Sequence, residues 1–180
     1  AEGFEAGGHN GREETTTFCL IPAVHEATTL PLIAAGGIGT GEGILAAMVL
    51  GAGGVQIGTR FALTEESSAS PVFKDYCLSL GEGDTKLLLK KLAPTRLVKN
   101  AFREAVEKAE DSGATSEELR TLLGRGRAKK GIFEGDLEGG ELEIGQVSAI
   151  ISRRQSVAEV MNELVESYRQ AVEKKYLFER

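Results

Sequence analysis

The sequence predicts an α/β fold followed by a mainly helical part, and three observations support this. A strand, a helix and a second strand follow one another within about thirty residues, 32–59, which indicates a βαβ unit with parallel strands. Both strands end in small residues, at Gly36-Gly37 and Gly58-Thr59. Beyond residue 65, apolar residues recur mostly at helical spacing. We therefore divide the chain into residues 1–65 and 66–180.

The composition limits the classes of function. The chain has 180 residues, of which 41% are hydrophobic, and a formal net charge of -6. Nucleic-acid binding needs clustered positive charge, so an extended nucleic-acid surface is not expected. No apolar run approaches the roughly 18–20 residues that cross a bilayer, so no membrane partner is expected. Cys19 and Cys77 lie far apart without a partner motif. They fit a reducing, cytoplasmic location and predict neither a disulfide nor a metal site.

The elements of the first part follow from local patterns. Residues 15–29 place apolar side chains at helical spacing, and Glu13 and Glu14 before them are interpreted as charges at the N-terminus of that helix. A short buried strand covers residues 32–35. A helix over residues 43–52 follows, with Gly51 as its C-terminal glycine. A second strand, with Val55 and Ile57, precedes Gly58.

The second part predicts three helices. The first covers residues 93–111, with Leu97, Val98, Phe102 and Val106 on one side. The second starts with Thr115 or Ser116 as its N-cap. The third covers residues 156–178, and its inner stripe is expected to be Val157, Val160, Met161, Leu164, Val165 and Tyr168. Residues 124–146, rich in glycine and in both charge signs, are interpreted as a long structured loop.

The two glycine-rich strand ends give the strongest chemical signal. Backbone N–H groups of a tight glycine turn beside a helix N-terminus form an anion site, and a Cβ would keep the backbone away from a phosphate. The loops Gly36-Gly37-Ile38 and Gly58-Thr59 can hold one phosphate together, as the last two strands of a TIM barrel do. The alternative is that these glycines only make tight turns. The pattern is not the G-x-G-x-x-G of a Rossmann dinucleotide site.

His9 is the candidate for proton transfer. It follows Gly7 and Gly8, which suits a backbone that passes close to a flat ligand. The alternative is an ordinary surface histidine. Glu5 is expected near the same strand end, whereas His25 has no such context and is interpreted as solvated.

A basic run, Arg125, Arg127, Lys129 and Lys130, lies in the predicted loop. We interpret it as solvated and balanced by the acidic residues Glu134, Asp136, Glu138, Glu141 and Glu143. The alternative is a docking site for an acidic carrier or for a cofactor phosphate.

Three motifs, "AEGFEAGGHNG", "PLIAAGGIGTGEG" and "GVQIGTRF", closely resemble the nitronate monooxygenase family, formerly the 2-nitropropane dioxygenases. This family also contains the FMN-dependent enoyl-acyl-carrier-protein reductase II. "APTRLVKN" and "GDLEGGELEIGQ" are similar to the family's helical substrate domain. The motifs occur in the family's order and spacing, and the resemblance covers nearly the whole chain.

The resemblance implies a TIM (β/α)8 barrel that holds FMN, with a helical substrate or lid domain at its catalytic face. His9 matches the catalytic histidine. Gly7, Gly8, Gly36, Gly37, Gly58 and Thr59 match flavin-contacting positions, the last two pairs on the phosphate, and Ile38 belongs to the same loop. The chain would supply only the end of strand six and strands seven and eight. We therefore expect a fragment that needs the N-terminal half of the barrel and binds FMN poorly alone.

The implied reaction is the oxidation of alkyl nitronates or nitroalkanes by oxygen to carbonyl compounds and nitrite. The alternative is the reduction of an enoyl thioester with NAD(P)H, which needs an acidic carrier protein and which the basic run favours. A third hypothesis is an interaction module without catalysis. The use of NAD(P)H, the formation of a homodimer and the physiological substrate stay open.

Overall fold

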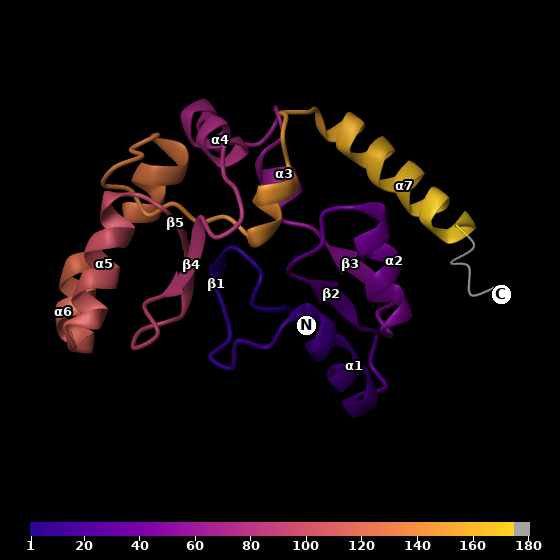
Figure 1. Cartoon of the computed structure of the whole chain (residues 1–180), viewed down its shortest axis with the longest axis horizontal. Coiled ribbons are helices and arrows are strands. Elements are labelled where there is room, and N and C mark those ends of the chain that lie inside the picture. The colour runs from indigo at the N-terminus through magenta and orange to yellow at the C-terminus, as the bar shows by residue number, and fades with distance from the viewer. Residues whose placement is uncertain (175–180) are drawn as a thin grey trace.

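The computed structural model describes residues 1–174, which form two sheets with helices around them (Figure 1). The first sheet pairs β2 (Ile33–Ala35) and β3 (Gly54–Gln56) in parallel, and α2 (Gly41–Val49) connects them. This confirms the predicted βαβ unit. The second sheet is antiparallel and has the order β1 (Gly8–His9), β5 (Thr95–Val98), β4 (Thr85–Leu88). No helix within residues 1–174 is long and apolar enough to cross a membrane.

The first sheet has its own hydrophobic core. The helix α1 (Thr17–Ala27) packs beside β2 and α2, and the long helix α7 (Val157–Glu173) lies along α2 (Figure 1). The buried residues of this core are Ile21, Leu32, Ala34, Ile38, Ala47 and Ala52. The helix α2 starts at the cap Thr40 and ends before Gly51, which has φ 108°. The expected C-terminal glycine is therefore in place.

The second part surrounds the antiparallel sheet. The helices α5 (Ala101–Asp111) and α6 (Ser116–Leu123) pack together on its outer side. A second core joins β5 to α4 (Pro71–Leu78) and to the 3-10 helix η2 (Gln146–Ile150). The short helix α3 (Thr59–Ala62) follows β3, and a turn of π-helix, η1 (Lys129–Phe133), lies in the predicted loop. As predicted, Thr115 caps α6, in a reciprocal pair with Glu118.

The predicted helix over residues 93–111 was wrong in its first half. Thr95–Val98 is a strand with all four residues buried, and the helix starts only after Asn100. This segment pairs with Leu88–Thr85 on one edge and with Gly8 and His9 on the other. Pairing on both edges fixes it as a strand, although its local spacing of apolar residues also fits a helix.

The prediction of the inner stripe of α7 was only partly correct. Val160 and Leu164 are buried, but Val157, Met161 and Val165 are 37%, 47% and 41% exposed. One narrow face of α7 packs against α2, so the rest of the apolar stripe stays open. The predicted end of this helix at residues 175–178 lies outside the described residues.

The interpretation of Glu13 and Glu14 was also wrong. The helix α1 starts at Thr17 with no acidic residue in its first turn, and Glu14 has φ 50° and forms an ion pair with Lys90. The carboxylate that serves this helix end is Glu5, whose two oxygens each accept the Thr17 N–H at 3.1 Å. A side chain from outside the helix thus supplies the negative charge that its N-terminus favours.

The two cysteines differ in environment. Cys19 is exposed on α1, whereas Cys77 lies in the second core, where burial raises the pKa of its thiol to about 12. Neither is in a disulfide. Cys77 is therefore a packing residue and a poor nucleophile.

Asn100 connects the N-terminus of α5 to residues 137–140. Its Oδ1 accepts the Arg103 N–H at 2.8 Å, and its Nδ2 donates to the carbonyls of Leu137 and Gly140 at 2.9 and 2.8 Å. We expect Asn100→Ala to lower the free energy of unfolding by about 2–3 kcal/mol, because one cap and two hydrogen bonds are lost. Urea unfolding measures this. Asn100→Asp keeps the cap acceptor and should lose less; equal losses would show that the cap contributes little.

Candidate functional site

A cavity of about 310 Å3 opens at the carboxyl ends of β2 and β3. Because the two strands are parallel neighbours, their following loops meet at one edge of the sheet. All seven residues expected to hold a cofactor line this cavity: Gly7, Gly8, Gly36, Gly37, Ile38, Gly58 and Thr59. Glu5, which was expected near this strand end, also lines the cavity. Its wall further includes residues that were not expected, among them Glu2, Gln56, Glu143, Ile144 and Gly145. The structure thus brings the glycine loops together.

The glycines of the two loops serve different purposes. Gly36 and Gly37 have φ 85° and 69°, and a Cβ on Gly36 would lie 2.5 Å from the carbonyl oxygen of Gly3. Gly36 is therefore required by the path of the chain itself. Gly58 has φ −93°, and a Cβ built on it would meet no atom within 4 Å. The fold does not need glycine at position 58, so its missing side chain only keeps the cavity open.

The loops present unpaired backbone donors. Within residues 1–174, the N–H groups of Gly37, Ile38, Gly58 and Thr59 donate to no protein acceptor. Thr59 also starts α3, whose first N–H groups have no partner inside the helix. Converging free N–H groups without a side-chain cation are the donor set that suits a phosphate. The residues present therefore fit the phosphate of a flavin nucleotide.

Residues 145–146 close one side of the cavity. The Gly145 N–H donates to Thr59 Oγ1 at 3.1 Å, and the Gln146 N–H donates to the Glu5 carbonyl at 2.9 Å. A Cβ on Gly145 would lie 2.6 Å from Thr59 Oγ1. Gly145 was not among the predicted site residues. Its signal in the sequence was a glycine after an alternating apolar pattern, Leu142 and Ile144, which is typical of a strand.

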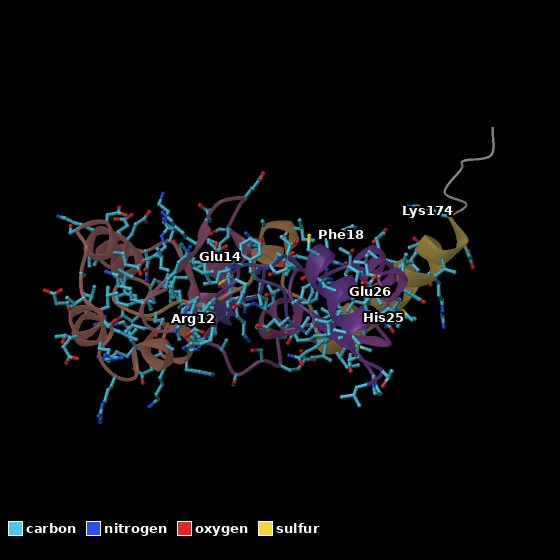
Figure 2. All side chains as sticks on the ribbon, turned by 90° about the horizontal axis from the view of Figure 1, so that it is seen from below. Arg12, Glu14, Phe18, His25, Glu26 and Lys174 are labelled. Atoms are coloured by element: carbon cyan, nitrogen blue, oxygen red, sulfur yellow. The ribbon has the colours of Figure 1, made fainter. Side chains whose placement is uncertain are left out.

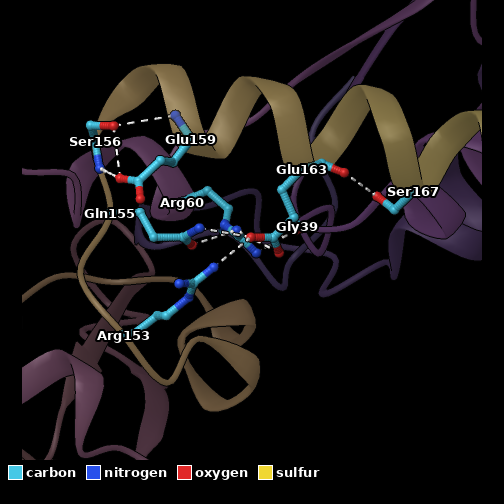
Figure 3. A network of polar contacts seen from close by, with 8 residues as sticks. All are labelled: Gly39, Arg60, Arg153, Gln155, Ser156, Glu159, Glu163 and Ser167. Carbon is cyan, nitrogen blue, oxygen red and sulfur yellow. Dashed lines mark hydrogen bonds and ion pairs between the residues drawn. The ribbon is translucent and has the colours of Figure 1, made fainter.

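Arg60 holds the two glycine loops in place through contacts outside the cavity (Figure 3). Its side chain is 6% exposed and donates to the Gly39 carbonyl at 3.4 Å and to Gln155 Oε1 at 2.9 Å. It also forms an ion pair of 2.9 Å with Glu163 of α7. Hydrogen bonds from Gln155 and Arg60 lower the pKa of Glu163, which keeps that carboxylate charged. The guanidinium therefore connects the loop after β2, the start of α3 and helix α7.

The segment Gly7-Gly8-His9 lies beside the cavity. A Cβ on Gly7 would be 2.5 Å from the carbonyl carbon of Ile144, so a close crossing of two chain segments already requires this glycine. Gly8 has φ 75°. His9 is exposed, pairs through its backbone with Thr95, and is not among the residues that line the cavity. His25 is exposed on α1, as expected, next to Glu26 (Figure 2), and its ring lies against Gly51, where a Cβ would be 2.4 Å from Cγ.

Glu143 and Glu141 were wrongly interpreted as solvated. Glu143 lines the cavity half-buried, and burial raises the pKa of its carboxyl, an effect that His9 opposes. Glu141 is only 7% exposed, and its pKa is raised to about 7, mainly by burial and also by Glu143. Leu142 and Ile144 enter the core, so these glutamates are held at its edge.

The residues of the basic run also differ in burial. Arg127 is half-buried, with its guanidinium 4.5 Å from the centre of the Phe102 ring. It donates to the carbonyls of Leu123 and Gly139 at 2.7 and 2.6 Å, so it is a structural residue. Arg125, Lys129 and Lys130 are exposed, as the solvated interpretation expects.

A second cavity, of about 560 Å3, lies between α2, β3, α3 and α7. Its wall is almost entirely apolar, with Met48, Phe61, Met161 and Val165 among its residues. It offers no converging N–H groups and is separate from the glycine loops. The first cavity is therefore the candidate site for a phosphorylated cofactor.

Comparison with known proteins shows which family the chain belongs to. The family model "Nitronate monooxygenase" matches residues 1–167. The chain belongs to the nitronate monooxygenase family. Probable nitronate monooxygenases of Staphylococcus haemolyticus and Staphylococcus aureus are 46% and 40% identical over 94 and 121 residues. These alignments cover 47% and 61% of this chain, and 26% and 34% of the two relatives.

Two solved structures are similar to this chain over most of its length. FabK from Thermotoga maritima matches with a TM-score of 0.89 and 35% identity, over 97% of this chain and 55% of that protein. Nitroalkane oxidase from Streptomyces ansochromogenes matches with a TM-score of 0.74 and 29% identity, over 96% of this chain and 51% of that protein. The chain thus spans about half the length of these structures.

Gly58 offers a test of ligand binding that leaves the fold intact. Gly58→Ala adds a methyl group where no protein atom lies within 4 Å, so the melting temperature should stay unchanged. We expect the dissociation constant of FMN to rise at least about tenfold, because the methyl group blocks close approach to the N–H groups. Fluorescence titration measures this. Gly36→Ala is the contrast: it should lower stability. Unchanged FMN affinity in Gly58→Ala would place the phosphate elsewhere.

Glu141 predicts a pH dependence of stability. Its pKa is about 7 in the folded chain, above the ordinary value of 4.5, so the folded state binds this proton more tightly than the unfolded state. Stability is therefore lost as the pH rises from 5 to 8. Glu141→Gln cannot ionise and should be more stable than the wild type at pH 8 by about 1–3 kcal/mol, with the difference shrinking toward pH 5. Urea unfolding at both pH values, with the exposed Glu138→Gln as control, measures this. A pH-independent difference would refute it.

Proposed function

We propose that this chain is part of an FMN-dependent oxidoreductase, a nitronate monooxygenase that oxidises alkyl nitronates or nitroalkanes with oxygen to carbonyl compounds and nitrite. One observation carries the proposal: the glycine loops after β2 and β3 direct free N–H groups into one cavity, in a chain of the nitronate monooxygenase family. The residues at this cavity are those expected to hold the flavin.

The chain's own groups would bind the cofactor by its phosphate. The N–H groups of Gly37, Ile38, Gly58 and Thr59 would donate hydrogen bonds to the phosphate oxygens, and Arg60 holds their loops in place. Gly8 would allow the flavin ring to approach the backbone. Bound FMN supplies the chemistry of accepting electrons from the substrate and passing them to oxygen.

His9 is the proposed proton-transfer residue. It directly follows Gly8, which lines the cavity, and its charge acts on Glu143 in the cavity wall. Histidine suits this role because it exchanges protons near neutral pH. With a neutral nitroalkane, His9 would take the proton from the α-carbon. With a nitronate, it would orient the nitro oxygens instead.

Membership of the family suggests the fold of the rest of the proposed enzyme. We propose a TIM barrel in which residues 1–65 provide strands seven and eight and the end of strand six, with residues 66–180 as the substrate domain. Support comes from Glu2, which pairs in parallel with Ala35, so that three chain segments lie side by side. The N-terminal half of the barrel is then a required partner. The two unpaired cysteines support a reducing, cytoplasmic location.

Enoyl-acyl-carrier-protein reductase II, with FMN and NAD(P)H, is the second candidate. The high structural similarity to FabK favours it, as do the exposed cations Arg125, Lys129 and Lys130, which could contact an acidic carrier. Oxygen uptake with a nitronate and without NADH supports the first candidate. NADH oxidation that depends on an enoyl thioester supports the second.

His9→Ala tests the enzymatic mechanism. We expect kcat with a neutral nitroalkane to fall about 100- to 10,000-fold, because a positioned general base typically contributes a factor of this size. Activity with the preformed nitronate should fall less, since its proton is already lost. Steady-state oxygen consumption measures both, and the FMN absorbance spectrum checks that the cofactor stays bound. An unchanged turnover would remove His9 from the mechanism, and the absence of any turnover in the wild type would favour the interaction module.

A further inference from the structure

One polar face of α7 contacts the helices that follow both glycine loops. Glu163 and Ser167 are one helical turn apart on α7, so their side chains lie on the same face (Figure 3). Glu163 pairs with Arg60, the second residue of α3. Ser167 accepts a hydrogen bond from Gly41, the first residue of α2. Although Glu163 and Ser167 do not line the cavity, they reach the helix after each loop.

Glu163 compensates the buried guanidinium of Arg60. The Arg60 side chain is 6% exposed, and within residues 1–174 Glu163 is the only carboxylate paired with it, at 2.9 Å. Gln155 supports the pair, because its Nε2 donates to Glu163 at 2.8 Å and its Oε1 accepts from Arg60 at 2.9 Å. A buried charge that loses its counter-ion is strongly disfavoured. Without Glu163, Arg60 would move toward water and leave the carbonyl of Gly39, which would separate the loop after β2 from α3.

Ser167 supplies an acceptor to the start of α2. The Gly41 N–H is one of the first N–H groups of that helix, which have no partner inside it, and it donates to Ser167 Oγ at 3.1 Å. The Ser167 hydroxyl itself donates to the Glu163 carbonyl at 2.7 Å. A Cβ on Gly41 would lie 2.0 Å from the backbone nitrogen of Tyr168, so α2 and α7 touch here without an intervening side chain. The position of the first turn of α2 therefore depends on α7.

We infer that Glu163 and Ser167 are positioning residues for the flavin phosphate: they hold the two glycine loops at the spacing in which the N–H groups of both reach one phosphate. This inference rests on the proposed function and adds residues outside the cavity to it. A phosphate oxygen needs its donors at about 2.7–3.2 Å, so a small shift of either loop weakens the contact. The flavin ring would lie beside Gly8, on a different segment of the chain, and its own binding should not depend on these two residues.

The test compares FMN with riboflavin, which has the same ring and lacks the phosphate. Fluorescence titration of the full chain, prepared without flavin, gives both dissociation constants. We expect the preference for FMN over riboflavin to fall about tenfold in Glu163→Ala and about threefold in Ser167→Ala, because a hydrogen bond to a charged group contributes more than a neutral one. The affinity for riboflavin should stay unchanged. A purely structural role would weaken both flavins equally and leave the preference intact.

Glu166→Ala is the matched control. It removes the same charge from the same helix, but Glu166 is exposed and its hydrogen bond, from Gln170 at 3.0 Å, stays within α7. The preference for FMN should therefore stay unchanged, which excludes a long-range effect of the charge on the phosphate. The inference is overturned if Glu163→Ala and Ser167→Ala keep the wild-type preference, or if Glu166→Ala reduces it equally.

Hydrogen exchange separates this inference from the proposed function, because it needs no flavin. The Ala62 N–H donates to the Gly58 carbonyl in the first turn of α3. The Ile44 N–H donates to the Thr40 carbonyl in the first turn of α2. The exchange rates of these two amides therefore report how firmly each loop is held.

Glu163→Ala should speed exchange at Ala62 about tenfold, and Ser167→Ala should speed exchange at Ile44 about threefold, whereas Glu166→Ala should change neither. Unchanged rates in the first two variants overturn the inference even where the wild type prefers FMN. If the wild type binds FMN no more tightly than riboflavin, the phosphate site of the proposed function fails, and the exchange rates still decide whether Glu163 and Ser167 hold the loops.

Discussion

The buried guanidinium of Arg96 is the interaction on which the candidate site depends. The residue is 2% exposed, and its Nε and Nη2 donate to the carbonyls of Phe4 and Ala6 at distances from 2.6 to 3.2 Å. Burial lowers the pKa of this side chain, but an arginine stays protonated in proteins, so the charge must be stabilised by these carbonyls. The segment that leads into Gly7, Gly8 and His9 is thereby fixed to β5.

Arg60 has the corresponding role on the other side of the cavity. Its contacts to Gly39, Gln155 and Glu163 keep the two glycine loops and α7 in one arrangement (Figure 3). The guanidinium groups of both arginines thus interact with the protein's own carbonyls and carboxylates. Neither lines the cavity, which leaves backbone N–H groups as the source of positive potential there.

This division of charge leaves the backbone of the glycine loops to bind an anion. The N–H groups of the glycine loops are directional and close to their ligand, so they stabilise a phosphate at one position. Glu143 also lines the cavity and lies against Gly8, where a Cβ would be 2.5 Å from its Oε2.

The sequence by itself determined the βαβ unit, the capped helices and the residues of the two glycine loops, because strand length, apolar spacing and the need for glycine are local properties. The family motifs added His9 and the expected flavin. Only the tertiary structure decided that Thr95–Val98 is a strand, that Arg127 is structural and that Glu143 faces the cavity. These features arise from pairing between segments far apart in the chain, as between Leu97 and Glu143. Local periodicity cannot encode such pairing, since it does not specify which partner covers a strand edge or buries a charge.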